Sequence, residues 1–341
     1  MNFTSIGNLT VAAIIATNDI SAEVTSPVYD EIFYQQMSEA PRLNDSIRVM
    51  SYNIRVDHGE DSHCENKWEH RKEKVESLIN RYAPDVLALQ EPNLMQLEDL
   101  QRAFGNEYAF TYFVVNPAAY DTPAEFPSEQ SRETQAILYK KERFIDKKIS
   151  NLGFWLSENP DVFSQIPSWD GSKYIRGANY VTLEDKITGK KFTVLNAHFD
   201  HQGLEARIAS ARLMIAKAYE IAPNDPVILV GDFNTFPGDS KVYNAFAESS
   251  LEFADVRDLA EKHYGIEASW VGWEYNNFNE KKLEQTNPGE PARFDQFFVK
   301  RGLVVVKWTG IPDDRFKMVW DGKLKEVYPS DHRPILAELL L

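Results

Sequence analysis

Short apolar runs that end in polar residues recur along the chain. In the clearest one, residues 227–230 are aliphatic and mostly β-branched, which predicts a strand buried on both faces. Asp232 and Asn234 follow, and on an extended chain they point to the same side, with Phe233 facing the other way. Open α/β sheets bind ligands at the carboxyl ends of such strands. The motif therefore predicts a polar site, although on its own it is equally typical of an Asp/Asn turn.

Similar patterns predict the other elements. Residues 46–56 alternate apolar and polar positions like a strand with one buried face, and residues 68–82 carry an apolar stripe at helical spacing. A hairpin is expected around Thr188 and Gly189. Further strands are predicted at 86–89, 108–115, 134–139, 149–156, 178–184, 191–197, 294–299, 303–308 and 335–337, and further helices at 94–104, 203–221 and 241–246. Strands and helices thus alternate along the chain, as in an α/β protein.

Three segments have no clear period. Residues 116–133 and 158–175 predict long loops, and Arg176 stands at the end of the second. Residues 266–280 contain Trp270 and three further aromatic residues among glycine and asparagine. Such clustered rings either stack on bases or sugars or simply fill a core. We expect these three segments to determine substrate choice.

The composition is that of an ordinary globular protein of 341 residues, 43 % hydrophobic and 26 % charged. We expect one domain over 46–341, preceded by a poorly ordered arm over 1–45. No apolar run is long enough for a transmembrane helix. A single cysteine, Cys64, excludes an internal disulfide framework and favours a cytoplasmic protein, with secretion as the alternative. A monomer is expected.

The net charge of −15, from 37 basic and 52 acidic residues, limits which nucleic acids and phosphoesters the protein is expected to bind. A protein that binds duplex DNA through phosphate contacts has the opposite balance, so stable duplex binding is not expected. A small phosphoester, or a few nucleotides of single-stranded RNA, remains compatible if a bound cation offsets the charge.

Polar residues at the strand ends form one chemical inventory. Acids and carboxamides with almost no sulfur predict a site for Mg²⁺ or Mn²⁺. Such a site suits phosphoester cleavage, in which Asp232 would activate water and Asp295 would fix the tautomer of His332. Taken singly, Glu91 is more typical of a carboxylate at a helix N-terminus, and His198 is more typical of a packed or capping histidine than of a catalyst. The inventory comprises Asn53, Glu91, His198, Asp232, Asn234, Asp295, Asp331 and His332.

The order of these motifs resembles the endonuclease/exonuclease/phosphatase superfamily, which holds DNases, inositol polyphosphate phosphatases, sphingomyelinases and nocturnin-like deadenylases. The resemblance extends over residues 47–340 and is closest to small single-domain bacterial and fungal members. It depends on six segments in order: SYNIR, LALQE, NAHFDH, GDFN, FDQFF and SDHRP. Departures are mild, since Phe294, Gln296 and Pro92 replace usual neighbours without removing a functional group.

The resemblance implies an α/β fold, a four-layer α/β sandwich of two packed, mainly antiparallel β-sheets flanked by helices. It implies that Glu91 binds the metal, with Asn53 and Asp331 completing its surroundings. His198 and Asn234 would touch the scissile phosphate, Asp232 would activate water, and a His332–Asp295 pair would stabilise the reacting phosphate. We further expect Arg55, Arg176 and Trp270 to bind substrate.

The leading hypothesis is a Mg²⁺-dependent phosphodiesterase, a 3′-to-5′ exonuclease acting on single-stranded RNA like the deadenylases. The alternative is a phosphatase or phosphodiesterase for a small phosphorylated metabolite or a phospholipid headgroup. A third class, a binding protein that kept the fold and lost the reaction, is disfavoured by the intact set of acids and histidines.

Overall fold

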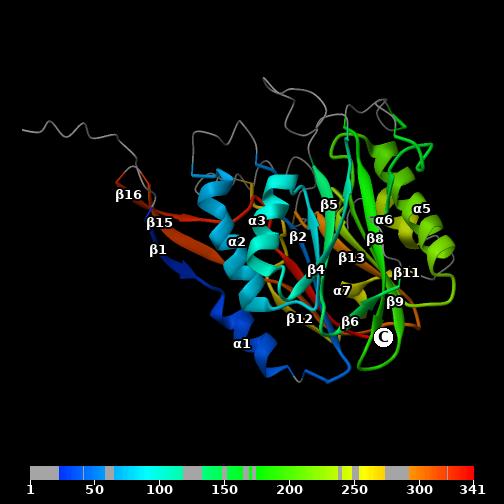
Figure 1. The fold of residues 1–341 in the computed structure, drawn as a ribbon, viewed down its shortest axis with the longest axis horizontal. Coiled ribbons are helices and arrows are strands. Elements are labelled where there is room, and N and C mark those ends of the chain that lie inside the picture. The colour runs from blue at the N-terminus through cyan, green and yellow to red at the C-terminus, as the bar shows by residue number, and fades with distance from the viewer. Residues whose placement is uncertain are drawn as a thin grey trace, which may run out of the picture.

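Two seven-stranded β-sheets stack face to face, and helices cover both outer faces (Figure 1). The computed structural model describes residues 23–40, 42–57, 65–117, 133–147, 152–163, 169–170, 174–236, 240–247, 253–272, 292–320 and 322–341. Most of the two predicted loops, the aromatic residues after Trp270 and the first 22 residues lie outside these ranges. None of the helices described has the length and apolar content that a membrane crossing requires.

The first sheet has the predicted strand after the arm at its centre. Its strands pair antiparallel except for β2 with β3 and β12 with β14. Helices α2 (Trp68–Tyr82) and α3 (Leu94–Phe104) cover its outer face, where the sequence predicted them. In spatial order the strands are β12 (Lys262–Gly265), β14 (Val305–Ile311), β17 (Ile335–Leu340), β2 (Ile47–Asn53), β3 (Val86–Gln90), β5 (Thr134–Lys140) and β4 (Tyr108–Val114).

The second sheet contains the run at 227–230, now strand β10, as an interior strand. Only β9 and β10 pair in parallel. Helices α5 (Leu204–Ile221) and α6 (Ser240–Ala247) pack on its outer face, and the short α7 (Val256–Leu259) follows β11. The order is β11 (Phe253–Asp255), β13 (Asp295–Lys300), β10 (Val227–Asp232), β9 (Lys191–His198), β8 (Gly177–Asp185) and β6 (Phe144–Asp146), with β7 (Gly153–Trp155) also on β8. The predicted four-layer sandwich is therefore confirmed.

The period of two along the strands separates the cores. In β10, Ile228 and Val230 pack between the two sheets, whereas Val227 and Leu229 pack under α5 and α6. In β2, Val49 faces the inter-sheet core and its neighbours face α2. Each strand therefore places every second side chain between the sheets, and its last inward-facing residue lies at the end of that layer.

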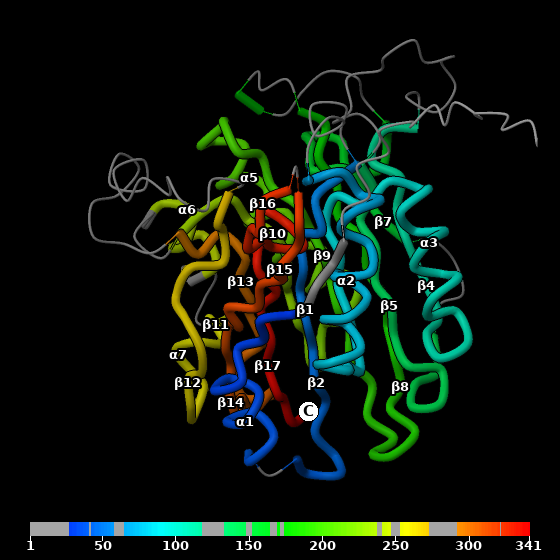
Figure 2. The backbone as a smooth tube through the Cα atoms, turned by 90° about the vertical axis from the view of Figure 1, so that its left-hand side faces the viewer, coloured from blue at the N-terminus to red at the C-terminus, as the bar shows by residue number. Residues whose placement is uncertain are grey.

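A third, three-stranded sheet was not predicted, and its first strand lies in the segment expected as the arm. It joins β1 (Glu23–Val28) to β15 (Arg315–Trp320), which pairs with β16 (Lys323–Val327). Helix α1 (Glu31–Glu39) follows β1, and Figure 2 shows it at the foot of the molecule, near β14. Phe33 is fully buried, with its ring centroid 5.6 Å from that of Tyr82. Helix α1 thus lies within the segment expected as the arm, and its apolar Phe33 completes the core beneath α2.

Candidate active site

Polar side chains gather at one end of the inter-sheet layer because strand register brings them there. Asp232 pairs in register with His198 of β9 on one side and with Asp295 of β13 on the other. All three share the parity of residues that face the other sheet, as does Asn53 at the end of β2. The predicted convergence of strand ends is therefore present in the fold.

Left-handed backbone conformations place three further side chains. Glu91 (φ 70°), Asn234 (φ 47°) and Arg55 (φ 58°) all have positive φ, which non-glycine residues adopt mainly at turns and functional sites. Alternation alone would point Glu91 toward the helices, so its left-handed turn redirects the chain at the end of β3. Glycine is required beside them at Gly231 (φ 148°), where a Cβ would lie 1.9 Å from the carbonyl oxygen of Ala197.

The GDFN segment is a turn as well as a site. Strand β10 ends at Asp232, and the backbone N–H of Asn234 donates to Asp232 Oδ1 at 2.9 Å. The assumption of an extended chain through Asn234 is therefore wrong, because this bond bends the chain. Asn234 nevertheless lines the same cavity as Asp232, and its Nδ2 donates to the carbonyl oxygen of Phe199 at 3.0 Å.

Asp232 lies at the centre of the polar cluster. Its Oδ2 accepts from Asn53 Nδ2 at 3.0 Å and faces the Nε2 atoms of His198 and His332 at 3.5 and 3.6 Å. Burial opposes its ionisation, but the two imidazoles and the donated hydrogen bonds hold the pKa of Asp232 below its usual range. The carboxylate is therefore ionised at neutral pH.

His332 and Asp295 form the pair that the sequence predicted. His332 Nδ1 lies 2.8 Å from Asp295 Oδ2, and the imidazole is 6 % exposed. Burial would lower the pKa of His332, but Asp295 and then Asp232 raise it to about 10. At neutral pH His332 therefore carries two N–H groups, one donating to Asp295 and one facing Asp232.

Glu91 is held by donors from the neighbouring strand. Its Oε1 accepts from Asn53 Nδ2 at 2.9 Å and its Oε2 from the backbone N–H of Val56 at 3.1 Å. Arg55 lies between Glu91 and Asp331, at 4.0 and 3.8 Å from their carboxylates. Burial opposes ionisation, but Arg55 most strongly holds the pKa of Glu91 well below its usual range. Glu91 does not cap α3, since Asn93 and Gln96 form that helix's capping box.

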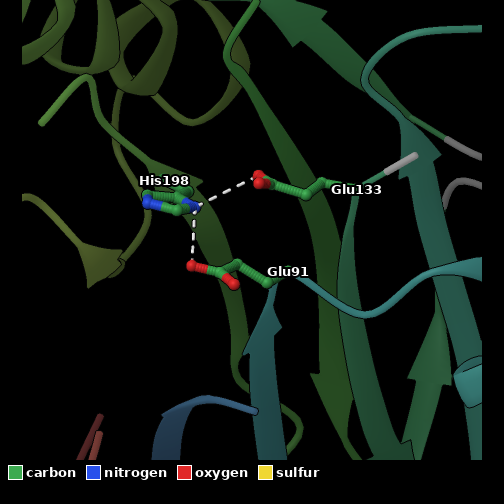
Figure 3. A group of neighbouring side chains, drawn as sticks. All are labelled: Glu91, Glu133 and His198. Carbon is green, nitrogen blue, oxygen red and sulfur yellow. Dashed lines mark ion pairs between the residues drawn. The ribbon is translucent and has the colours of Figure 1, made fainter. Parts of the chain in front are cut away.

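A carboxylate that the sequence reasoning missed completes this wall. Glu133 Oε2 lies 3.5 Å from His198 Nδ1 and 2.7 Å from Arg176 NH1, and Figure 3 shows Glu133 and Glu91 converging on the same imidazole. Arg176 NH1 also donates to His198 Nδ1 at 3.1 Å. Glu133 stood at the edge of a segment interpreted as a surface loop. Its one available signal was its position directly before an apolar strand.

These residues surround one cavity of about 430 Å³. Trp270 and Phe294 form one edge, with ring centroids 5.7 Å apart, and Trp270 bridges to His332 through the backbone. Of the predicted site residues, Asn53 and Asp295 stand behind the wall rather than on it. The lining residues are Arg55, Val56, Glu91, Glu133, Arg176, His198, His201, Arg207, Asp232, Asn234, Phe236, Trp270, Phe294, Asp331 and His332.

The donor set suits a hard divalent cation. Glu91, Glu133 and His198 offer ligand atoms within 4.8 Å of one another, and so do Asp232, Asp295 and His332. Buried carboxylates that face each other repel unless a cation lies between them. Their oxygen-rich chemistry matches Mg²⁺ or Mn²⁺ better than a thiolate-binding metal.

A two-sheet sandwich with acids and histidines converging at one end of its strands defines a class of hydrolytic enzymes. The chain belongs to the Endonuclease/Exonuclease/phosphatase family, whose model matches residues 50–332. Members of this family hydrolyse phosphoester bonds and generally use a divalent metal. The resemblance inferred from the six segments is therefore confirmed.

Relatives within the family differ in substrate. The structure of a mannosyl-6-phosphatase from Bacteroides thetaiotaomicron superposes with a TM-score of 0.71 at 28 % identity, covering 86 % of this chain and 100 % of that one. Another family protein from the same organism gives 0.71 at 29 %, covering 86 % and 97 %. Mouse nocturnin is 26 % identical over 273 residues, 74 % of this chain. The chain spans only 58 % of nocturnin's own length.

Proposed function

We propose that this protein is a divalent-metal-dependent phosphoester hydrolase whose substrate is a small phosphorylated compound of the sugar phosphate class. The observation that carries the proposal is the convergence of Glu91, Asp232, His198 and His332 on one cavity of about 430 Å³. Each of these groups has a distinct protonation or bonding state that suits one part of phosphoester cleavage.

Asp232 is the group that orients and deprotonates the attacking water. It is ionised, and Asn53 and the N–H of Asn234 fix both of its oxygens. A carboxylate held from behind in this way keeps a lone pair directed at the water without reorganising during the reaction.

The two histidines are donors to the phosphate. His332 is protonated at neutral pH and directs Nε2–H into the cavity, where it offsets negative charge as the phosphorus–oxygen bond breaks. Arg176 can only donate, so the bond from its NH1 requires His198 Nδ1 to accept and leaves the proton on Nε2. Both imidazoles thus present an N–H toward Asp232 and the bound phosphate.

Glu91 would hold the cation, with Asn53, Asp331 and Glu133 around it. When bound, Mg²⁺ or Mn²⁺ offsets the phosphoryl charge and stabilises the leaving oxygen. Arg55, 4.0 Å from the Glu91 carboxylate, favours the ionised form of Glu91.

The size and charge of the cavity favour a small substrate. A volume of about 430 Å³ accommodates one sugar phosphate or one nucleotide. Arg55 and Arg176 are engaged by cavity carboxylates, and the net charge of −15 opposes the approach of a long polyanion. The 28 % identical mannosyl-6-phosphatase supports the same class.

The proposal is tested by a substrate panel with Mg²⁺: 4-nitrophenyl phosphate, bis(4-nitrophenyl) phosphate, mannose 6-phosphate, inositol phosphates and poly(A). We expect the highest kcat/KM on a small monoester, with the activity lost in EDTA. If the protein hydrolyses none of these compounds, the enzyme assignment is overturned and a binding protein is favoured.

A second candidate is the 3′-to-5′ exonuclease predicted from the sequence. Two observations favour it: the nocturnin relative, and the Trp270–Phe294 edge, whose rings could stack on a base. Progressive shortening of poly(A) from its 3′ end, faster than release of phosphate from the sugar phosphates, would establish this activity over the first.

A further inference from the structure

One guanidinium connects two imidazoles on the cavity wall. Arg176 NH1 bonds His198 Nδ1 at 3.1 Å, and its other terminal nitrogen, NH2, bonds His201 Nδ1 at 3.3 Å. Arg176 is itself 7 % exposed and is held by Glu133 at 2.7 Å. The two histidines therefore share one rigid, buried support.

This arrangement fixes the tautomer of His201 as well as that of His198. A guanidinium has no acceptor, so His201 Nδ1 accepts and its proton resides on Nε2. Nε2 lies on the side of the ring away from Arg176. His201 lines the cavity, so it supplies a second neutral N–H donor beside the one that serves the phosphate.

Packing and loop geometry hold His201 in place. Its ring centroid lies 4.3 Å from that of Tyr174, and Arg176 lies over the same tyrosine at 5.6 Å. The buried Asp200 closes the turn around it, since Asp200 Oδ1 accepts the backbone N–H groups of Gln202 and Gly203, each at 2.7 Å. A donor positioned in this way loses little entropy when it binds a ligand.

We propose that His201 is a specificity-determining residue that donates its Nε2–H to a hydroxyl or ring oxygen of the substrate's alcohol portion, while His198 and His332 serve the phosphate. The inference depends on the proposed function, because it needs a phosphoester in the cavity. A neutral donor on this wall suits an uncharged oxygen, and a site built to bond a hydroxyl discriminates against a leaving group that lacks one.

The test compares a substrate rich in hydroxyls, mannose 6-phosphate, with one whose alcohol portion has none, 4-nitrophenyl phosphate. The measured quantity is the ratio of kcat/KM for the two compounds in the wild type, His201→Phe and His201→Gln. Phenylalanine keeps a ring in contact with Tyr174 but removes the donor, whereas the amide of glutamine restores one. His263→Phe is the matched control, because His263 lies on β12, outside the cavity.

We expect the ratio to fall at least tenfold in His201→Phe, mainly through the KM for mannose 6-phosphate, and to recover in part in His201→Gln. The control should keep the wild-type ratio. An equal loss on both compounds, or a wild type with no preference for the hydroxylated substrate, would overturn the role of His201. Either result leaves the proposed function standing if 4-nitrophenyl phosphate is hydrolysed, whereas no hydrolysis of either compound removes the proposed function itself.

Discussion

The two ends of strand β3 carry buried carboxylates of opposite character. Asp85 immediately precedes the strand, and its Oδ2 accepts from Arg42 at 2.6 Å, from Arg143 at 3.0 Å and from the backbone N–H of Arg48 at 2.8 Å. Glu91 immediately follows the strand, and its nearest guanidinium, that of Arg55, is 4.0 Å away. One strand thus separates a carboxylate neutralised by close arginines from one that we propose binds the cation.

The same contrast extends across both sheets. At the Asp85 end, Asp185 pairs with Arg143 at 3.1 Å and Glu338 with Arg48 at 3.1 Å. At the other end, Asp232 is bonded by an amide and a backbone N–H and faces imidazoles at 3.5 Å and beyond. The first end stabilises the sandwich through close arginine pairs. The second holds Asp232 with an amide, a backbone N–H and imidazoles, and leaves it on the wall of the cavity that we propose as the active site.

The largest expected effect comes from neutralising Asp232. Asp232→Asn should lower kcat on 4-nitrophenyl phosphate by about 10³-fold, the magnitude typical of a lost general base. The variant should stay folded, with a modest fall in the midpoint of thermal unfolding, because the fold favours the Asp232 charge through two imidazoles and two donated hydrogen bonds. A variant that loses activity only because it unfolds would contradict this role for Asp232.

Neutralising Asp85 should have the opposite consequence. Asp85→Asn removes the buried carboxylate that Arg143, the more exposed Arg42 and the backbone N–H of Arg48 share, so urea denaturation should show a loss of about 3 kcal/mol in the free energy of unfolding. The kcat of the folded fraction should remain at the wild-type value, since Asp85 lies at the other end of β3 from the cavity. Equal stability of the Asp85→Asn and Asp232→Asn variants would remove the distinction between the two ends.

The ion pairs at the Asp85 end of β3 were harder to predict from the sequence than the candidate site at the Glu91 end. Strand ends with acids or amides are visible from local patterns, and hence Glu91, Asp232 and His198 were found. Asp85 and Arg143 acquire their meaning only through contacts between distant strands, which a single sequence does not display. Glu133 was not predicted as a site residue for the same reason. Its partner Arg176 is 43 positions away in the sequence and is brought close only by the fold.

Fold prediction failed at the periphery, for a related reason. The central strands have strong apolar patterns because both faces are covered, whereas β15 and β16 alternate charged and apolar residues at the molecule's edge. Helix α1 has only two buried side chains, Phe33 and Met37, and is stabilised by packing below α2 rather than by its own pattern. Tertiary contacts thus determine these elements.

Adding Mg²⁺ should raise the stability of the protein through the Glu91 end of strand β3 and not through the Asp85 end. Mg²⁺ at 100 times its dissociation constant should raise the free energy of unfolding by about 2.7 kcal/mol, since it binds only the folded state. Glu91→Gln should require far more Mg²⁺ for the same gain and for activity, while Asp85→Asn should show the wild-type increment on its lower baseline. An unchanged Mg²⁺ dependence in Glu91→Gln would exclude it as a ligand.

Lys74 is a third buried charged residue, and it allows the effect of burial on stability to be measured apart from the effect of ion pairing. Its expected effect is the smallest of those predicted. In the described part of the chain, the ammonium group of Lys74 on α2 donates to the carbonyl oxygen of His70 rather than to a carboxylate. Burial, and then Arg71, lowers the pKa of Lys74 from 10.5 to about 8. Between these values the unfolded chain keeps the proton that the folded protein has released. The free energy of unfolding should therefore rise with pH from about 8 to 10.5 and carry a constant penalty below 8.

Lys74→Met should remove that penalty. Equilibrium denaturation at pH 7 should show a gain of roughly 2 kcal/mol, discounted from 1.36 kcal/mol per pKa unit for residual solvation. The stability difference between variant and wild type should then shrink toward pH 10.5, whereas the control Lys72→Met, on the same helix, should show no such trend. A loss of stability in Lys74→Met would mean that this ammonium is paired as favourably as Asp85, and that burial of charge stabilises the sandwich wherever it occurs.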